Sequence, residues 1–120
     1  MRTIATLGIV ILAWGLALGA NSADTDRGQQ AFQKRCAGCH GLDVDKEGPA
    51  LKGVFGRRAG SRANFPYSEA LKAAGFSWDK TALDRWLTDP DAVVPGTDMA
   101  FRLSDRAERE LIIAYLEQLK

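Results

Sequence analysis

The sequence predicts an all-α domain of short helices joined by long loops. Apolar residues recur at three- and four-residue spacing in four segments, residues 24–36, 67–74, 79–88 and 104–120. No convincing pair of strands appears, and residues 41–66 are rich in Gly, Pro, Asn and Asp without a sustained period. Loops of this length are unusual in a compact helical domain unless another body fills its centre.

The chain begins with the features of a secretory signal. Arg2 precedes an apolar run over residues 4–20, and small residues follow it. We expect a signal peptide over residues 1–23, cleaved somewhere in 19–23, and one domain over residues 24–120. An uncleaved membrane anchor is the alternative, although the run is slightly shorter than the roughly 20 residues that a spanning helix needs. Either outcome exports the domain.

The first predicted helix runs from Asp24 to Cys36. Asp24 or Asp26 can cap its start, and Phe32 belongs to its apolar side. Gly28 within this helix costs about 1 kcal/mol relative to Ala. A close approach by another backbone would justify that cost.

The remaining helices are bounded by turn and cap signals. In the segment 79–88, Leu83, Trp86 and Leu87 have helical spacing, and Asp89-Pro90 is expected to end the helix because Pro lacks the amide hydrogen. A turn-rich stretch over 94–99 follows. Ser104 or Asp105 is expected to cap the last helix, with Glu108 at capping-box distance.

One short motif carries most of the chemistry. Cys36-Ala37-Gly38-Cys39-His40 is a C-x-x-C-H string, the signature of covalent haem c attachment. In a helical turn its thiols and imidazole lie on one face, so Cys36 and Cys39 can form thioethers while His40 reaches the iron. A structural zinc site needs four protein ligands, whereas the chain holds two Cys and one His. A thioredoxin-like motif would follow a strand, and none is predicted before Cys36.

Export agrees with this assignment. Covalent haem attachment in bacteria takes place outside the cytoplasm, so the signal and the motif together predict a periplasmic protein with one covalent haem c. In that oxidising compartment the two cysteines would otherwise pair. Here we expect thioether bonds to consume both.

The sequence offers a single candidate for the second protein ligand of the iron. His40 is the only His, which excludes a bis-histidine haem within one chain. Of the two Met, Met1 leaves with the signal, so Met99 is the remaining thioether. A Met99 that merely fills a core gap is the alternative. His/Met ligation favours Fe(II) and leaves no open coordination position, which describes an electron carrier.

The charge balance excludes some partners. The chain has 16 basic and 15 acidic residues, and loss of Arg2 with the signal leaves 15 of each. Nucleic-acid binding calls for a basic stripe, and the alternating charges here indicate an ordinary solvated surface. We expect no nucleic-acid partner.

The ordered set of motifs resembles the class I c-type cytochromes, in particular the mitochondrial and purple-bacterial soluble branch. The resemblance runs from Gly28 to Leu119. Besides the haem-attachment string, it rests on Gly48-Pro49-x-Leu51-x-Gly53-Val54-Phe55-Gly56-Arg57, Phe65-x-Tyr67-Ser68-x-Ala70, Gly75-x-x-Trp78, Leu87-x-x-Pro90, Pro95-Gly96-Thr97-x-Met99-x-Phe101, Arg109 and the segment 111–116.

The resemblance implies a cytochrome c fold wrapped around one haem, with the first and last helices crossing where Gly28 meets Tyr115. It implies that the carbonyl of Pro49 accepts a hydrogen bond from His40, which would orient the imidazole. It also implies a haem environment, including propionate partners, made by Arg57, Tyr67, Trp78 and Thr97.

Two departures from that branch bear on function. The mitochondrial proteins surround the haem edge with lysines, whereas this chain has no lysine between Lys80 and Lys120 and carries Asp89, Asp91 and Asp98 there. Strong electrostatic steering is therefore not expected. In addition, Trp86 stands where a tyrosine near the Met ligand is usual, and the sequence alone does not give the direction in which this shifts the reduction potential.

The expected function is that of a soluble, monomeric, single-haem electron carrier, with no catalytic residue. It would pass one electron from a reductase or dehydrogenase to an oxidase, a reductase or a photosynthetic centre in a respiratory or photosynthetic chain. A dedicated or membrane-tethered cytochrome subunit of one dehydrogenase or oxidase is an alternative. A haem peroxidase or gas sensor is another, and it requires Met99 to leave the iron.

Overall fold

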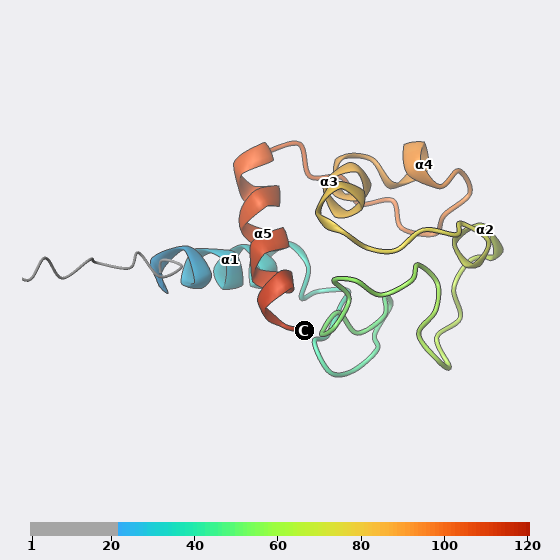
Figure 1. Cartoon of the computed structure of the whole chain (residues 1–120), viewed down its shortest axis with the longest axis horizontal. Coiled ribbons are helices and arrows are strands. Elements are labelled where there is room, and N and C mark those ends of the chain that lie inside the picture. Colours follow the sequence, from blue (N-terminus) through green and yellow to red (C-terminus); the bar gives the residue numbers. More distant parts are fainter. Residues whose placement is uncertain (1–21) are drawn as a thin grey trace, which may run out of the picture.

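The computed structural model describes residues 22–120, which form an all-α domain (Figure 1). Within these residues the only β-type pairing is an isolated bridge between Arg58 and Ser77. The helices are α1 (Ser22–Arg35), α2 (Glu69–Lys72), α3 (Lys80–Thr88), α4 (Pro90–Val93) and α5 (Arg106–Gln118). The predicted fold class is confirmed.

The proposed signal lies almost entirely outside the described part of the chain. Of residues 1–23, only Ser22 and Ala23 are described, and both belong to α1. Over residues 22–120, no helix combines the length and the apolar content needed to span a membrane.

The two terminal helices cross at a glycine, as expected. Figure 1 shows α5 crossing α1. A Cβ atom on Gly28 would lie 2.6 Å from the carbonyl oxygen of Leu111 and 2.9 Å from Cβ of Tyr115. Beside this contact the rings of Phe32 and Tyr115 pack with their centroids 5.6 Å apart. The cost of glycine inside α1 is therefore offset by close helix packing.

An ion pair joins the same two helices near the haem-attachment string. Arg35 donates from Nε and Nη2 to the two carboxylate oxygens of Glu108, at 2.6 and 3.2 Å. Glu108 was expected to complete a capping box with Asp105, but only half of that box forms. The amide of Glu108 donates to Asp105 at 2.9 Å, while the Glu108 carboxylate turns to Arg35. With Arg35 the Glu108 carboxylate makes two hydrogen bonds to an oppositely charged group, whereas the capping box would offer it one neutral backbone amide.

Two helix boundaries differ from the prediction. Asp24 and Asp26 do not cap α1, because the helix already includes Ser22. Asp89-Pro90 ends α3 at Thr88 as expected, but it also starts α4, which the sequence reading missed. Proline is well suited to the first turn of a helix, where its missing amide hydrogen would have no partner, and the Asp89 side chain accepts from the amide of Ala92.

Buried Arg109 ties α5 to α3 and to the segment before α5. Its Nε donates to Asp84 at 2.8 Å, and its Nη1 donates to the carbonyls of Leu103 and Ser104, both at 2.9 Å. The amide of Leu103 in turn donates to Leu87 at 2.8 Å. These bonds fix the segment that follows Met99.

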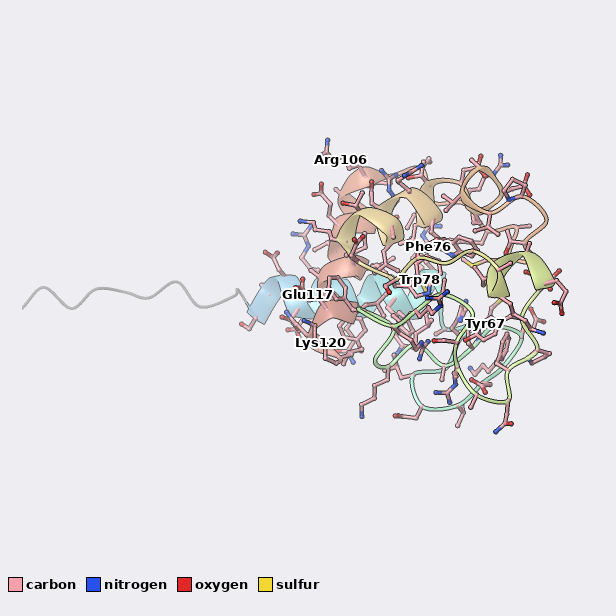
Figure 2. All side chains as sticks on the ribbon, turned by 45° about the vertical axis from the view of Figure 1, so that its right-hand side comes forward. Tyr67, Phe76, Trp78, Arg106, Glu117 and Lys120 are labelled. Atoms are coloured by element: carbon pink, nitrogen blue, oxygen red, sulfur yellow. The ribbon has the colours of Figure 1, made fainter. Side chains whose placement is uncertain are left out.

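The aromatic core lies between these helices and the long loops. Trp78 packs edge-on against Phe76, with centroids 4.9 Å apart, and against Trp86, with centroids 5.1 Å apart. Figure 2 shows Phe76 and Trp78 side by side. The loop residues 36–68 leave a space on the other side of this core, which forms the candidate site.

Candidate haem-binding site

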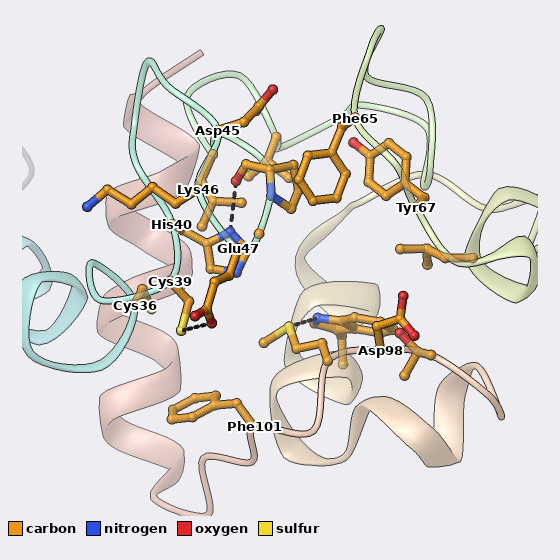
Figure 3. A pocket seen from close by; sticks show the side chains of 18 of the residues that line it. Cys36, Cys39, His40, Asp45, Lys46, Glu47, Phe65, Tyr67, Asp98 and Phe101 are labelled. Atoms are coloured by element: carbon orange, nitrogen blue, oxygen red, sulfur yellow. Dashed lines mark hydrogen bonds between the residues drawn. The ribbon is translucent and has the colours of Figure 1, made fainter.

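A cavity of about 490 Å³ opens between the loop that follows α1 and the loop that precedes α5. Its lining includes Cys36, Cys39, His40 and Met99. Figure 3 shows Cys36, Cys39 and His40 on one side, and Asp98, the neighbour of Met99, across from them. The volume lies within the usual range for small-molecule sites. Residues about 60 positions apart in the sequence thus meet around one space.

The two thiols are free and differ in exposure. Cys36 is buried and Cys39 is exposed, and they do not form a disulfide. Burial raises the pKa of the Cys36 thiol to about 11. The pKa of Cys39 is raised mainly by its hydrogen bond to Glu47, at 3.5 Å from Sγ to Oε2. Both thiols are therefore mainly protonated at neutral pH, and neither is consumed by a disulfide.

His40 is held in one tautomer. Its Nδ1 lies 2.8 Å from the carbonyl oxygen of Pro49, and because a carbonyl only accepts, Nδ1 carries the proton. Burial lowers the pKa of the imidazole, and the bond to Pro49 opposes this only in part. The neutral ring therefore has a free lone pair on Nε2, as a metal ligand requires.

Gly48 permits the loop to pass close to that ring. A Cβ atom on Gly48 would overlap the His40 imidazole, at 2.7 Å from Nε2 and closer still to Nδ1 and Cε1. The amide of Gly48 donates to the carbonyl of Cys39 at 2.8 Å. The Gly48-Pro49 pair thus supplies both the space and the acceptor for His40.

Met99 lines the cavity and accepts a hydrogen bond from Trp86. The indole Nε1 of Trp86 lies 3.2 Å from Sδ of Met99, and the bond is drawn as a dashed line in Figure 3. A thioether sulfur has two lone pairs, so the one that accepts from Trp86 leaves the second free to bind a metal. Over residues 22–120, the His, Cys, Asp and Glu side chains form no group of three or more that could hold a metal ion.

Of the four residues implied as the haem environment and Pro49, the implied partner of His40, all but one line the cavity, namely Pro49, Tyr67, Trp78 and Thr97. The fifth, Arg57, does not; its Nη2 donates to the carbonyl of Ala50 at 3.0 Å. Burial lowers the pKa of the Arg57 guanidinium. This cation therefore holds the backbone next to Pro49 and is not part of the cavity lining.

Two residues at the site were missed by sequence reasoning. Asp45 lines the cavity and accepts, through Oδ1, from the amide of Ala50 and from Nε of Arg62, both at 2.7 Å. Arg62 also donates its amide to the Tyr67 hydroxyl at 3.3 Å. No local signal in the sequence identifies these contacts, because they depend on how the loop 41–66 folds back on itself.

The residues fit a covalently attached haem. Two unpaired thiols lie beside an imidazole with a free Nε2, an apolar cavity separates them from a thioether, and a Cβ at Gly48 would obstruct the imidazole. The donor set of one imidazole and one thioether suits haem iron.

Comparison with known proteins identifies the family. The family model "Cytochrome c" matches residues 25–120. Cytochrome c2 of Rhodoblastus acidophilus is 42% identical over 103 residues, which cover 82% of this chain and 95% of that protein. Cytochrome c of the plant Stellaria longipes is 39% identical over 104 residues, covering 83% of this chain and 96% of the relative.

A solved structure agrees in fold. Cytochrome cH from Methylobacterium extorquens matches with a TM-score of 0.75 and 42% identity, over 79% of this chain and 98% of that one. Members of the family carry covalent haem c, for which Cys36 and Cys39 stand in the expected arrangement. The chain therefore belongs to the cytochrome c family, a family of electron carriers.

Proposed function

We propose that this protein is an exported, single-haem electron-transfer protein in which His40 and Met99 would both bind the haem iron and keep it low-spin. Cys36 and Cys39 form the thioethers. Pro49, Tyr67, Trp78 and Thr97 would surround the haem, and Arg57 would support this wall by holding the carbonyl of Ala50. The function is outer-sphere electron transfer, so no residue acts as an acid, base or nucleophile.

The observation that carries the proposal is that two candidate iron ligands, an imidazole and a thioether, line the same cavity. The bond from His40 Nδ1 to Pro49 leaves Nε2 free, and Met99, the only Met outside the first residue, lines the same cavity. A haem iron bound between an imidazole and a thioether supplies a one-electron couple of raised potential. Both proposed ligands are held in place by other residues. His40 is hydrogen-bonded to the carbonyl of Pro49, and Met99 is hydrogen-bonded to Trp86 and followed by a segment whose Leu103 is bonded to Leu87. Little reorganisation on electron transfer is expected from such a site.

We further propose periplasmic localisation, with residues 1–23 as a signal peptide and residues 24–120 as the functional domain. The support is the order of Arg2, the apolar run and the small residues, together with the haem-attachment string. Redox proteins on either side of the carrier are the expected partners, and the carrier itself is a monomer.

The charges near the site support a weak, transient docking mode. Acidic residues on the Met99 side cap helices: Asp79 caps α3, Asp89 caps α4 and Asp105 caps α5. Asp84 pairs with Arg109. These four acids therefore have structural roles, and the chain has no lysine between Lys80 and Lys120. This favours association through a small surface at the haem edge with little steering.

Weak electrostatic steering is also compatible with a second function, that of a cytochrome bound permanently to one dehydrogenase or oxidase. Gel filtration at high salt, of soluble extract and of detergent-solubilised membranes, distinguishes a free carrier from such a subunit. A free carrier elutes alone, whereas a dedicated subunit co-elutes with its enzyme.

The proposed function is tested by reoxidation kinetics of the reduced, haem-loaded protein with a substitution-inert inorganic oxidant. An outer-sphere carrier reacts in a single second-order phase whose rate rises linearly with oxidant concentration. A rate that saturates at the rate of ligand loss would show that the iron must open first, and would contradict the proposal.

A further inference from the structure

The peptide group between Pro49 and Ala50 is hydrogen-bonded at both ends to ionisable side chains. Its carbonyl oxygen accepts from His40 Nδ1 at 2.8 Å, and its N–H donates to Oδ1 of Asp45 at 2.7 Å. One planar peptide unit therefore lies between a carboxylate and the proposed axial imidazole. Figure 3 shows Asp45 and His40 on the same side of the cavity.

The Asp45 carboxylate is held in this position. Arg62 donates from Nε to the same oxygen at 2.7 Å. The amide of Ala50 and the Arg62 guanidinium hold the pKa of the Asp45 carboxyl below its ordinary value, so the group is charged at neutral pH. Arg57 fastens the next peptide by donating to the carbonyl of Ala50, a residue that is 1% exposed. The chain from carboxylate to imidazole is therefore short and fixed.

We propose that Asp45 is a positioning residue for His40, acting through the Pro49–Ala50 peptide on the electron-donating strength of the imidazole. This inference rests on the proposed ligation of iron by His40. The proposal goes beyond the bond between His40 and Pro49, because it assigns a role to the Asp45 carboxylate, which is not hydrogen-bonded to the imidazole.

The physical basis is cooperativity along a hydrogen-bonded chain. A carboxylate that accepts from a peptide N–H polarises that peptide and places more negative charge on its carbonyl oxygen. The carbonyl then becomes a stronger acceptor for His40 Nδ1–H, and the imidazole becomes a stronger donor at Nε2. A stronger imidazole donor stabilises Fe(III) relative to Fe(II). Asp45 therefore opposes, in part, the rise in potential that Met99 produces.

A matched pair of variants separates this relay from a simple charge effect. Asp45→Asn keeps an oxygen that can accept from Ala50 but removes the charge. Glu47→Gln removes one negative charge from the same cavity wall, and Glu47 makes no hydrogen bond to the Pro49–Ala50 peptide. Asp45→Ala removes both the charge and the acceptor.

Two measurements on the haem-loaded proteins are needed, the reduction potential and the proton NMR shift of His40 Nδ1–H in the reduced state. We expect Asp45→Asn to raise the ratio of Fe(II) to Fe(III) at a fixed potential about threefold more than Glu47→Gln does. At 59 mV per tenfold change for one electron, the reduction potential of Asp45→Asn should then rise by about 28 mV more than that of Glu47→Gln. The His40 Nδ1–H resonance should move upfield in both Asp45 variants and stay in place in Glu47→Gln.

Equal potential shifts in Asp45→Asn and Glu47→Gln, with an unmoved His40 resonance, would overturn the relay. If Asp45→Ala fails to take up haem, Asp45→Asn still decides the question because it retains the acceptor. Failure of the proposed function is recognised separately. A wild-type protein without a low-spin spectrum contradicts His40/Met99 ligation, whereas a low-spin wild type with an ineffective Asp45 contradicts the relay alone.

Discussion

The indole N–H of Trp86 donates to the sulfur of Met99 over 3.2 Å. Trp86 belongs to α3 and is only 6% exposed, and its ring is packed against Trp78 at 5.1 Å. An indole N–H can donate but cannot accept. The sulfur of Met99 therefore meets a donor whose position and role are both fixed.

Substitution of Trp86 by Phe is expected to lower the reduction potential. A hydrogen bond to the thioether withdraws electron density from sulfur, so its loss makes Met99 a better donor and stabilises Fe(III). A hydrogen bond of this kind contributes about 0.5–1.5 kcal/mol in total, which limits the change in the Fe(III)/Fe(II) equilibrium to about tenfold. Protein-film voltammetry of the two proteins measures the shift. An unchanged or raised potential in Trp86→Phe would mean that the bond to Met99 does not persist in the loaded protein.

Gly28→Ala is expected to destabilise the domain by about 1–3 kcal/mol, because its added methyl group has no space between α1 and α5. Gly38→Ala is the matched control, since a Cβ at Gly38 meets nothing within 4 Å. Denaturant unfolding of both haem-loaded variants checks the difference. A Gly28→Ala variant as stable as Gly38→Ala would contradict the close crossing of the terminal helices.

Loss of the Arg109 guanidinium is expected to cost about 2–3 kcal/mol in Arg109→Leu, because the buried carbonyl of Leu103 and the partly buried carbonyl of Ser104 lose a charged donor. Arg106→Leu, also in α5, is the control: its side chain is 82% exposed and pairs with Glu110 one turn away. Pairs of that kind contribute less than about 1 kcal/mol. Urea unfolding measures both variants, and similar losses in the two would refute the special role of Arg109.

The contribution of Asp45 to stability is expected to depend on pH in the acidic range. Because the folded-state pKa of Asp45 is below its unfolded value of about 3.9, its ionised form stabilises the fold above that value. This contribution is lost as the pH falls through the folded-state pKa. The difference in unfolding free energy between wild type and Asp45→Asn should be largest above about pH 5. It should shrink as the pH falls below about 4. Thermal unfolding over this range measures the gap, and a gap independent of pH would contradict the assignment.

The sequence predicted those features that depend on local spacing or on elimination. The C-x-x-C-H string places three side chains on one face of a turn, and a chain with one His and one Met after position 1 leaves few choices of ligand. The order of the helices followed from apolar periodicity and from the Asp105 cap of the last one.

Features that depend on contacts between distant segments could not be predicted in the same way. Glu108 has a local capping role by its spacing, yet its carboxylate pairs with Arg35, which lies 73 residues away. Asp45 stands in a loop without periodicity, and only the folded loop brings it to the amide of Ala50.

The closure of the iron site by Met99 is the central claim, and carbon monoxide binding tests it most directly. The visible spectra of reduced wild type and reduced Met99→Ala, each with and without the gas, should be compared. We expect a low-spin wild type that does not respond to carbon monoxide and a Met99→Ala variant that binds it. A wild type that binds carbon monoxide readily would contradict the closed site, and the chain would then have to be considered as a gas sensor or peroxidase.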